Sequence, residues 1–250
     1  MDLSIIIPVL EESKKIARDI EAASEFLMSN RLKGEIIIVD DGSRDKTCEV
    51  AEALKVPTEI TLRVIRLDQH RGKGCAVRTG MKLSQGHYAM FADSGCCVPY
   101  NNVLNALTLL KNDNCDIAHG SRKLEHSRIH VPQVWYRRIY SMLFRWLIIV
   151  VMKVPSELTD TQCGFKIYRG DLARKLYGEC VTDGFMFDVE ILLRARRRRY
   201  HIKEFPVEWS ADRDSRLAQT LSLKGLFTEL MNIKQALGKS SKEASMNPCR

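Results

Sequence analysis

The sequence predicts an α/β fold in which helices flank an open, mostly parallel β-sheet of the Rossmann type. In its N-terminal half, short runs rich in Ile and Val alternate with segments of helical periodicity. Strands that are buried on both faces have continuous apolar sequences, and alternating strands and helices form right-handed parallel crossovers. We find no repeat and no linker, so we expect a single domain over residues 1–237, followed by a polar, disordered tail at 238–250.

Strands and helices are expected to alternate up to residue 111. Each expected strand is rich in β-branched or aromatic residues, and each expected helix has apolar residues three and four positions apart. The expected strands are 4–9, 35–41, 61–67 and 87–93, and the expected helices are 13–28, 46–54, 72–84 and 101–111. A further strand is expected to end within CDIAHGSR, residues 115–122.

The pattern changes between His130 and Pro155. The segment QVWYRRIYSMLFRWLIIVVMKVP mixes Trp, Tyr and Arg with apolar residues at a helical period, which is typical of an amphipathic helix in a membrane interface. A buried helix with arginines at its ends is the alternative interpretation. The apolar run at 146–152 is too short to span a bilayer, so we expect a peripheral association.

The chain carries a formal net charge of +8, which favours an anionic partner. Candidate partners are nucleic acid, a phosphorylated small substrate and an anionic membrane surface. The basic run RARRRR at 194–199 is typical of a solvated helix face or of an anchor for lipid headgroups. No recognised nucleic-acid motif accompanies this run, so we expect no nucleic-acid partner.

The N-terminus and the cysteines bear on the compartment. The chain opens with MDLSIIIPVLEE, which has neither a basic leader region nor a cleavage site, so we expect a cytoplasmic protein. Its eight cysteines include no C-x-x-C pair. We therefore expect reduced thiols, with no zinc site and no disulfide framework.

Carboxylates lie at the carboxyl ends of two of the expected strands. Asp40 and Asp41 lie in VDDGSRDKT at 39–47, at the end of the strand at 35–41, and Asp93 ends the strand at 87–93. Ligands of such sheets bind beyond the carboxyl ends of the strands. The basic, glycine-rich loop of HRGKGCAVRTG at 70–80 suits a phosphate, although its spacing is neither that of a P-loop nor that of a dinucleotide fingerprint.

Taken in order, these blocks resemble the family-2 glycosyltransferases of the GT-A fold over about residues 3–210. The most specific blocks are DTQCGFKIYRGD at 160–171 and DGFMFDVEILLRARRRRYHIKEFPVEW at 183–209, which are most similar to the dolichyl-phosphate β-glucosyltransferase branch. The resemblance implies an inverting transfer of a hexose, glucose, from the nucleotide sugar UDP-glucose to a dolichyl or other polyprenyl phosphate. Together with the positive charge and the segment at 133–152, it implies a peripheral enzyme at the cytosolic face of a membrane, and a membrane protein is a candidate further partner.

The same resemblance assigns roles to individual residues. The nucleotide-sugar side comprises Pro8, Glu12, Asp40, Asp41, Arg71, Lys73, Asp93 and Arg122. The acceptor side comprises Gln162, Gly164 and Phe165, with Asp160 orienting the acceptor or serving as a base. Asp93 is the residue assigned to the donor diphosphate and its Mg²⁺ or Mn²⁺.

The metal motif departs from the family pattern, because Asp93, Ser94 and Gly95 stand where family members carry Asp-x-Asp. Three accounts remain open. Asp93 and the donor diphosphate together hold a cation, since Mg²⁺ needs only one or two carboxylates besides substrate phosphates. Alternatively, fixed Arg and Lys side chains neutralise the diphosphate. In the third account the chain is a degenerate, non-catalytic homologue that binds a sugar nucleotide.

Overall fold

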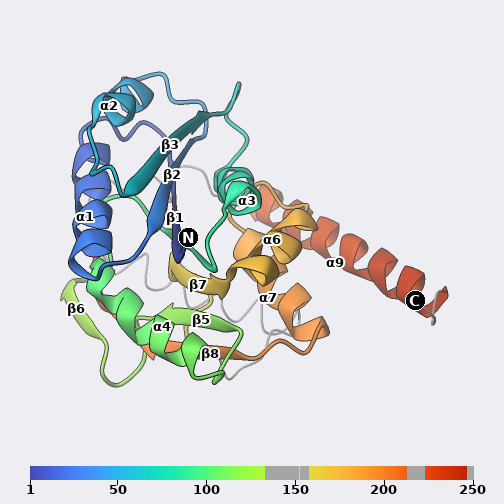
Figure 1. Ribbon diagram of the computed structural model, residues 1–250. Helices are drawn as coiled ribbons and strands as arrows, with labels where there is room; N and C mark the ends of the chain where they lie inside the picture. The colour runs from blue at the N-terminus through green and yellow to red at the C-terminus, as the bar shows by residue number, and fades with distance from the viewer. Residues whose placement is uncertain (133–151, 153–157, 213–222, 247–250) are drawn as a thin grey trace.

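The computed structural model describes residues 1–132, 152, 158–212 and 223–246. Within these residues the central sheet has seven strands in the order β3-β2-β1-β4-β7-β5-β8 (Figure 1). They are β1 (Leu3–Val9), β2 (Gly34–Asp40), β3 (Ile60–Arg66), β4 (Tyr88–Ala92), β5 (Ile117–Ser121), β7 (Phe165–Arg169) and β8 (Ile202–Pro206).

Most neighbouring strands of this sheet are parallel. Strand β7 runs antiparallel to β4 and to β5, whereas the other hydrogen-bonded pairs run parallel. The open, mostly parallel sheet of a single α/β domain is therefore confirmed. The position of β7 between β4 and β5 was not predicted, because nothing local in its sequence specifies its neighbours.

Two layers of helices cover the sheet. The helices of the described residues are α1 (Ile16–Ser29), α2 (Thr47–Ala53), α3 (Lys73–Leu83), α4 (Val103–Lys111), α6 (Gly170–Gly178), α7 (Phe187–Arg197) and α9 (Leu223–Met246), with a 3₁₀ turn η1 (Tyr100–Asn102). Helices α1 and α4 pack on one face of the sheet, and α3, α6 and α7 pack on the other (Figure 1). The four helices expected before residue 112 are present with shifted ends.

Strand β1 shows how the sequence produces this core. All seven of its residues are buried; Ile5 and Ile7 face the α1 layer and Ile6 faces the α3 layer. Each fully buried Ile contributes roughly 1.5–3 kcal/mol relative to exposure. A continuous apolar run is therefore stable only at the centre of a sheet covered on both faces.

Helix α1 begins at Ile16, three residues later than its periodicity predicts. The backbone amides just before the helix instead donate hydrogen bonds to side chains of the segment that follows β2. The Glu12 amide donates to the Thr47 hydroxyl at 2.8 Å, and the Ser13 amide donates to the Asp45 carboxylate at 3.2 Å. These bonds tie the loop after β1 to the loop after β2. Both loops lie at the carboxyl edge of the sheet.

A second, two-stranded sheet pairs β6 (Arg128–Val131) with β9 (Glu208–Ser210) in parallel. Beyond it, α9 packs on α7 through Leu230, Ile233 and Leu237, and its far end extends away from the rest of the chain (Figure 1). The helix continues to Met246, whereas the composition predicts disorder from residue 238.

The helix expected at 133–152 lies outside the described residues, except for Met152, which packs against the α7–α9 cluster. In the part of the chain that the structure describes, no helix has both the length and the apolar character needed to cross a membrane.

Candidate active site

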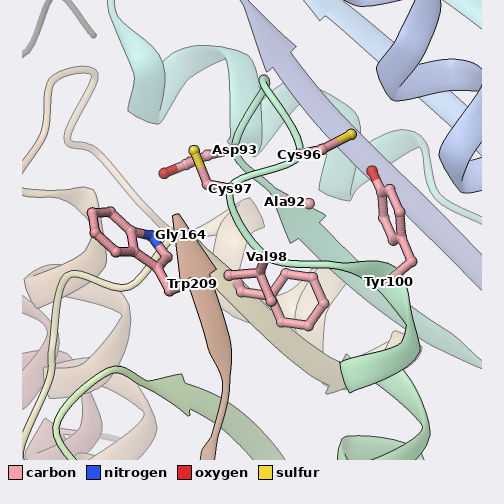
Figure 2. Close-up of a pocket in the computed structure, with 9 residues that line it drawn as sticks. Ala92, Asp93, Cys96, Cys97, Val98, Tyr100, Gly164 and Trp209 are labelled. Atoms are coloured by element: carbon pink, nitrogen blue, oxygen red, sulfur yellow. The ribbon is translucent and has the colours of Figure 1, made fainter. Parts of the chain in front are cut away.

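The residues assigned from the sequence lie along one edge of the sheet, at or after the carboxyl ends of β1, β2, β3, β4 and β5 and at the start of the antiparallel β7. A small pocket at this edge is lined by Ala92, Asp93, Cys96, Cys97, Val98, Tyr100, Gly164, Phe165 and Trp209 (Figure 2). Asp93 follows β4 directly, and Gly164 immediately precedes the antiparallel strand β7. The acceptor-side block is therefore brought against the metal-motif block by the sheet itself.

Asp41 fixes the basic loop that precedes α3. Its carboxylate accepts hydrogen bonds from the backbone amides of Arg71 and Gly72, both at 2.8 Å, and its Oδ2 lies 2.7 Å from Nδ1 of His70. Asp41 is itself buried. Its negative charge therefore orients the loop that carries the cationic side chains.

Asp40, the last residue of β2, is turned inward. Its Oδ1 accepts a hydrogen bond from the Ser43 amide at 3.1 Å and from the Ser43 hydroxyl, and its Oδ2 accepts one from the Cys48 thiol at 3.0 Å. The Asp-Gly turn is thus stabilised by this carboxylate. Pro8 is buried in β1, where it pairs with Val39 of β2, the residue that precedes Asp40.

Lys73, the first residue of α3, forms an ion pair with the Oδ1 atom of Asp93. Its ammonium also lies 5.8 Å from the ring centroid of Phe91. Burial opposes the charged form of this lysine, but the carboxylates of Asp93 and Asp188 outweigh it, so the pKa of Lys73 is raised. Lys73 is consequently a permanent cation at physiological pH.

Arg71 points to a different carboxylate. Its Nη2 lies 2.8 Å from Oδ2 of Asp183, and Arg78 of α3 contacts the other oxygen of the same side chain. Partial burial opposes ionisation, yet the hydrogen bonds from Arg78 and Arg71 lower the pKa of Asp183. A β-carbon at Gly72 would meet the Asp183 carbonyl oxygen at 2.5 Å, so these two loops are in close contact.

Arg122 and Asp160 form a bidentate pair on the acceptor side. The guanidinium donates from Nε at 2.6 Å and from Nη2 at 2.8 Å, and the Arg122 amide adds a third bond at 3.1 Å. Burial opposes ionisation of Asp160, but these bonds hold its pKa well below its usual range. The guanidinium also lies 5.2 Å from the ring centroid of Trp209.

Gly164 allows Asp93 to occupy its place. A β-carbon at residue 164 would lie 2.0 Å from Oδ2 of Asp93, and the Asp93 amide donates to the Gly164 carbonyl at 3.0 Å. Phe165 follows with its ring buried against Tyr100 and Phe205. Gln162 of the same block is partly exposed.

The residues that sequence reasoning missed are buried charges behind the site. Lys166 of β7 lies 2.9 Å from the Asp188 carboxylate of α7 and 5.1 Å from the ring centroid of Phe91, the ring that Lys73 also faces. The side chains of Lys166 and Asp188 are 1% and 7% exposed. A lysine inside an apolar strand is the signal in the sequence that points to such a pair.

The donor set near Asp93 does not fit a dedicated site for Mg²⁺ or Mn²⁺, which prefer several oxygen ligands. Among the described residues, no three His, Cys, Asp or Glu side chains converge in an arrangement suited to a metal ion. Asp93 is engaged by Lys73. Burial, together with the charges of Asp93 and Asp212, raises the pKa of Cys97 to about 12, so Cys97 is a neutral thiol.

The sequence matches the family described as glycosyl transferase family 2 over residues 4–176. The dolichyl-phosphate beta-glucosyltransferase of Saccharomyces cerevisiae is 31% identical over 251 residues, which covers 94% of this chain and 74% of the yeast protein. The dolichyl-phosphate beta-glucosyltransferase of Homo sapiens is 29% identical over 244 residues, with coverage of 93% and 74%.

A solved structure has a similar fold. The glucosyl-3-phosphoglycerate synthase from Mycobacterium tuberculosis, in complex with Mn²⁺ and uridine-diphosphate-glucose, has a TM-score of 0.66 at 18% identity, covering 94% of this chain and 77% of that chain. The central sheet agrees with this likeness. From the family match and the yeast relative we conclude that the chain belongs to glycosyl transferase family 2 and is a glycosyltransferase with the GT-A fold.

Proposed function

We propose that this glycosyltransferase transfers glucose from UDP-glucose to a dolichyl or other polyprenyl phosphate, with inversion at the anomeric carbon. The names of the yeast and human relatives support the acceptor and the sugar, and the UDP-glucose in the Mycobacterium tuberculosis complex supports the donor. The structural observation that carries the proposal is the Lys73–Asp93 pair at the carboxyl edge of the sheet. A fixed cation at this edge suits the diphosphate of a nucleotide sugar.

The donor side is built on the two loops tied together at this edge. In the proposal, Pro8, Glu12, Asp40 and Asp41 belong to the nucleotide end, where the buried Pro8 and Asp40 support the loops rather than touch the ligand. Arg71, Lys73 and Asp93 belong to the diphosphate end. Asp41 contributes by holding the amides of Arg71 and Gly72, which brings the start of α3 towards the diphosphate.

The acceptor brings its own nucleophile. A phosphomonoester has its second pKa near roughly 6, so a lipid phosphate is largely dianionic at neutral pH and needs little help from a base. Its oxygen forms a bond to C1 of glucose while the bond from C1 to the β-phosphate oxygen breaks, and UDP leaves with that electron pair. The protein's task is in-line placement and stabilisation of the leaving group.

Asp160 is proposed to orient the acceptor through Arg122 rather than to accept a proton. Its lowered pKa and its three hydrogen bonds from Arg122 make it a weak base. The guanidinium of Arg122, held between Asp160 and the ring of Trp209, has the geometry to bind a phosphate oxygen. Gln162, Gly164 and Phe165 are proposed to border the same acceptor side.

A peripheral position at the cytosolic face of a membrane completes the proposal. The net charge of +8 supports attraction to anionic lipids, and Arg196, Arg197 and Arg199 at the end of α7 are exposed. The basic run is only partly solvated, because Arg194 is buried in an ion pair with Glu190 at 2.7 Å. The amphipathic segment at 133–152 is the proposed interfacial element.

The test is transfer by the purified protein from UDP-glucose to a short polyprenyl phosphate, with the product identified by mass spectrometry. The polyprenol of the same length, which lacks the phosphate, is the matched acceptor control, and GDP-mannose is the competing donor. We expect a glucosyl lipid only with the phosphate and UDP-glucose, in the β configuration because UDP-glucose is α-linked.

Two Arg→Gln variants test the acceptor side. Arg122→Gln removes the group proposed to bind the phosphate and should lower kcat/KM for the lipid by about tenfold to a hundredfold. Arg128→Gln changes an arginine whose side chain is 75% exposed and should leave transfer unchanged. If the unmutated protein binds UDP-glucose but forms no product, the result would instead support the interpretation of the chain as a non-catalytic homologue.

A further inference from the structure

Position 95, where the family pattern has a second carboxylate, is a glycine in this chain, so only its backbone amide and carbonyl can make polar contacts. Gly95 has φ +88°, its amide donates to Oδ2 of Asp19 at 2.7 Å, and its carbonyl accepts from Nη2 of Arg18 at 2.9 Å. Both Arg18 and Asp19 belong to α1. The helix therefore clamps this loop in a left-handed conformation that residues other than glycine adopt at a cost.

Another carboxylate approaches this position, but it has a cationic partner of its own. A β-carbon on Gly95 would lie 3.4 Å from Oδ2 of Asp212, and that oxygen lies 2.7 Å from the ammonium of Lys15. Lys15 also lies 3.5 Å from the carboxylate of Glu12. Asp93 and Asp212 each face a lysine, so neither presents an unneutralised charge to a dication.

The ammonium of Lys73 is held in place yet reachable from solvent. Asp93 binds it, the ring of Phe91 lies beside it at 5.8 Å, and 22% of the side chain is exposed. An ammonium has three donors, so it keeps donors for a phosphate oxygen while it contacts Asp93.

We propose that the Lys73 ammonium takes the place of the divalent cation at the donor diphosphate, so that this chain binds UDP and UDP-glucose independently of Mg²⁺ and Mn²⁺. The inference rests on the proposed nucleotide site and specifies how that site neutralises charge. Among the residues that the structure describes, Gly95 provides no carboxylate beside Asp93 and Asp212 is paired with Lys15, so no second carboxylate supports a dication there, and Lys73 supplies the fixed positive charge.

The experiment is calorimetric titration of UDP into the full chain, first in EDTA and then with excess Mn²⁺ or Mg²⁺. We expect the same Kd in all three conditions within about threefold, which is well under the 1.4 kcal/mol of a tenfold change. The electron paramagnetic resonance signal of free Mn²⁺ should be unchanged by addition of the protein. This second readout is independent of catalysis.

Two Lys→Met variants locate the effect. Lys73→Met should weaken UDP binding in EDTA by about tenfold to a hundredfold, as expected for loss of a hydrogen bond to a charged group. Lys82→Met changes an exposed lysine of the same helix and should have no effect on the Kd. Circular dichroism checks that both variants fold, and if Lys73→Met does not, Lys73→Arg should retain binding in EDTA.

Three outcomes overturn the inference. Binding of UDP that appears only with Mn²⁺ or Mg²⁺ overturns it but leaves the proposed function standing. Equal loss of affinity in Lys73→Met and Lys82→Met would show that the effect comes from the net charge of the protein and not from the position of Lys73. Absence of UDP binding in every condition contradicts both the inference and the proposed function.

Discussion

Arg122 and Asp160 are joined by two side-chain hydrogen bonds of 2.6 and 2.8 Å across 38 residues of sequence, at a site where Asp160 is 3% exposed. The pair connects the end of β5 to the segment that leads into β7. Because Asp160 has no comparable partner in the unfolded chain, its ionisation is coupled to folding.

This coupling predicts a loss of stability in acid. The pKa of Asp160 is lowered in the folded state, so its contribution is present above the unfolded value of roughly 3.9 and is lost as the pH falls below it. Asp160→Asn should cost about 3 kcal/mol at pH 7, because Arg122 loses its ionic partner. Urea unfolding from neutral to acid pH should show a weaker pH dependence for the variant.

The exposed pair of Arg128 and Glu208 is the control for that prediction. Its charged atoms are 3.9 Å apart and its side chains are 75% and 45% exposed, so Arg128→Gln should change stability by less than about 1 kcal/mol. Equal effects of Asp160→Asn and Arg128→Gln would contradict the assigned role of burial.

Gly164→Ala should displace the Asp93 carboxylate. The added carbon would lie 2.0 Å from Oδ2 of Asp93 and 2.1 Å from its Cγ, so the whole group must turn away from Lys73. We expect a loss of UDP affinity of about tenfold or more, measured by calorimetry. Gly178→Ala is the matched control, because nothing lies within 4 Å of its added carbon. Unchanged affinity in both variants would show that Asp93 does not support donor binding.

The buried pair of Lys166 and Asp188 predicts strong non-additivity. Lys166→Met leaves Asp188 without its partner and should cost about 3–5 kcal/mol of unfolding free energy. Lys166→Met combined with Asp188→Leu should recover most of this loss, since two apolar residues can replace a buried ion pair. A double-mutant cycle in urea measures the coupling, and a cost equal to the sum of the single variants would contradict the pairing.

The adjacent thiols Cys96 and Cys97 should react slowly. Figure 2 shows their side chains on opposite sides of the loop, and burial together with nearby carboxylates raises the pKa of each to about 12. At pH 8 both thiols are therefore almost entirely protonated, whereas the thiolate fraction of an ordinary cysteine is roughly 0.2. Iodoacetamide should modify both at least tenfold more slowly in the native protein than in urea, as followed by peptide mass spectrometry.

A fast reaction of Cys97 in the native state would mean that the site carries a thiolate. The charge balance around Asp93 would then need revision, because a thiolate is a metal ligand and a neutral thiol is a poor one.

The sequence by itself determined the sheet and the helices of the N-terminal half. Ile-rich runs such as that of β1 and apolar residues at helical spacing are patterns among residues close in sequence. Their secondary structure can therefore be predicted without knowledge of the tertiary fold. The same reasoning located Asp40, Asp41 and Asp93 at the carboxyl ends of strands. The family resemblance added the glycosyltransferase identity, which the family match confirms.

Only the tertiary structure decided which charges meet. Lys73 and Asp93 are 20 residues apart, Arg122 and Asp160 are 38 apart, and Asp19 reaches Gly95 across 76 residues. These partners meet because of the order of the strands in the sheet, and Arg122 meets Asp160 because the antiparallel β7 lies between β4 and β5. A local pattern does not contain that order, because it arises when the whole chain buries its apolar faces at once.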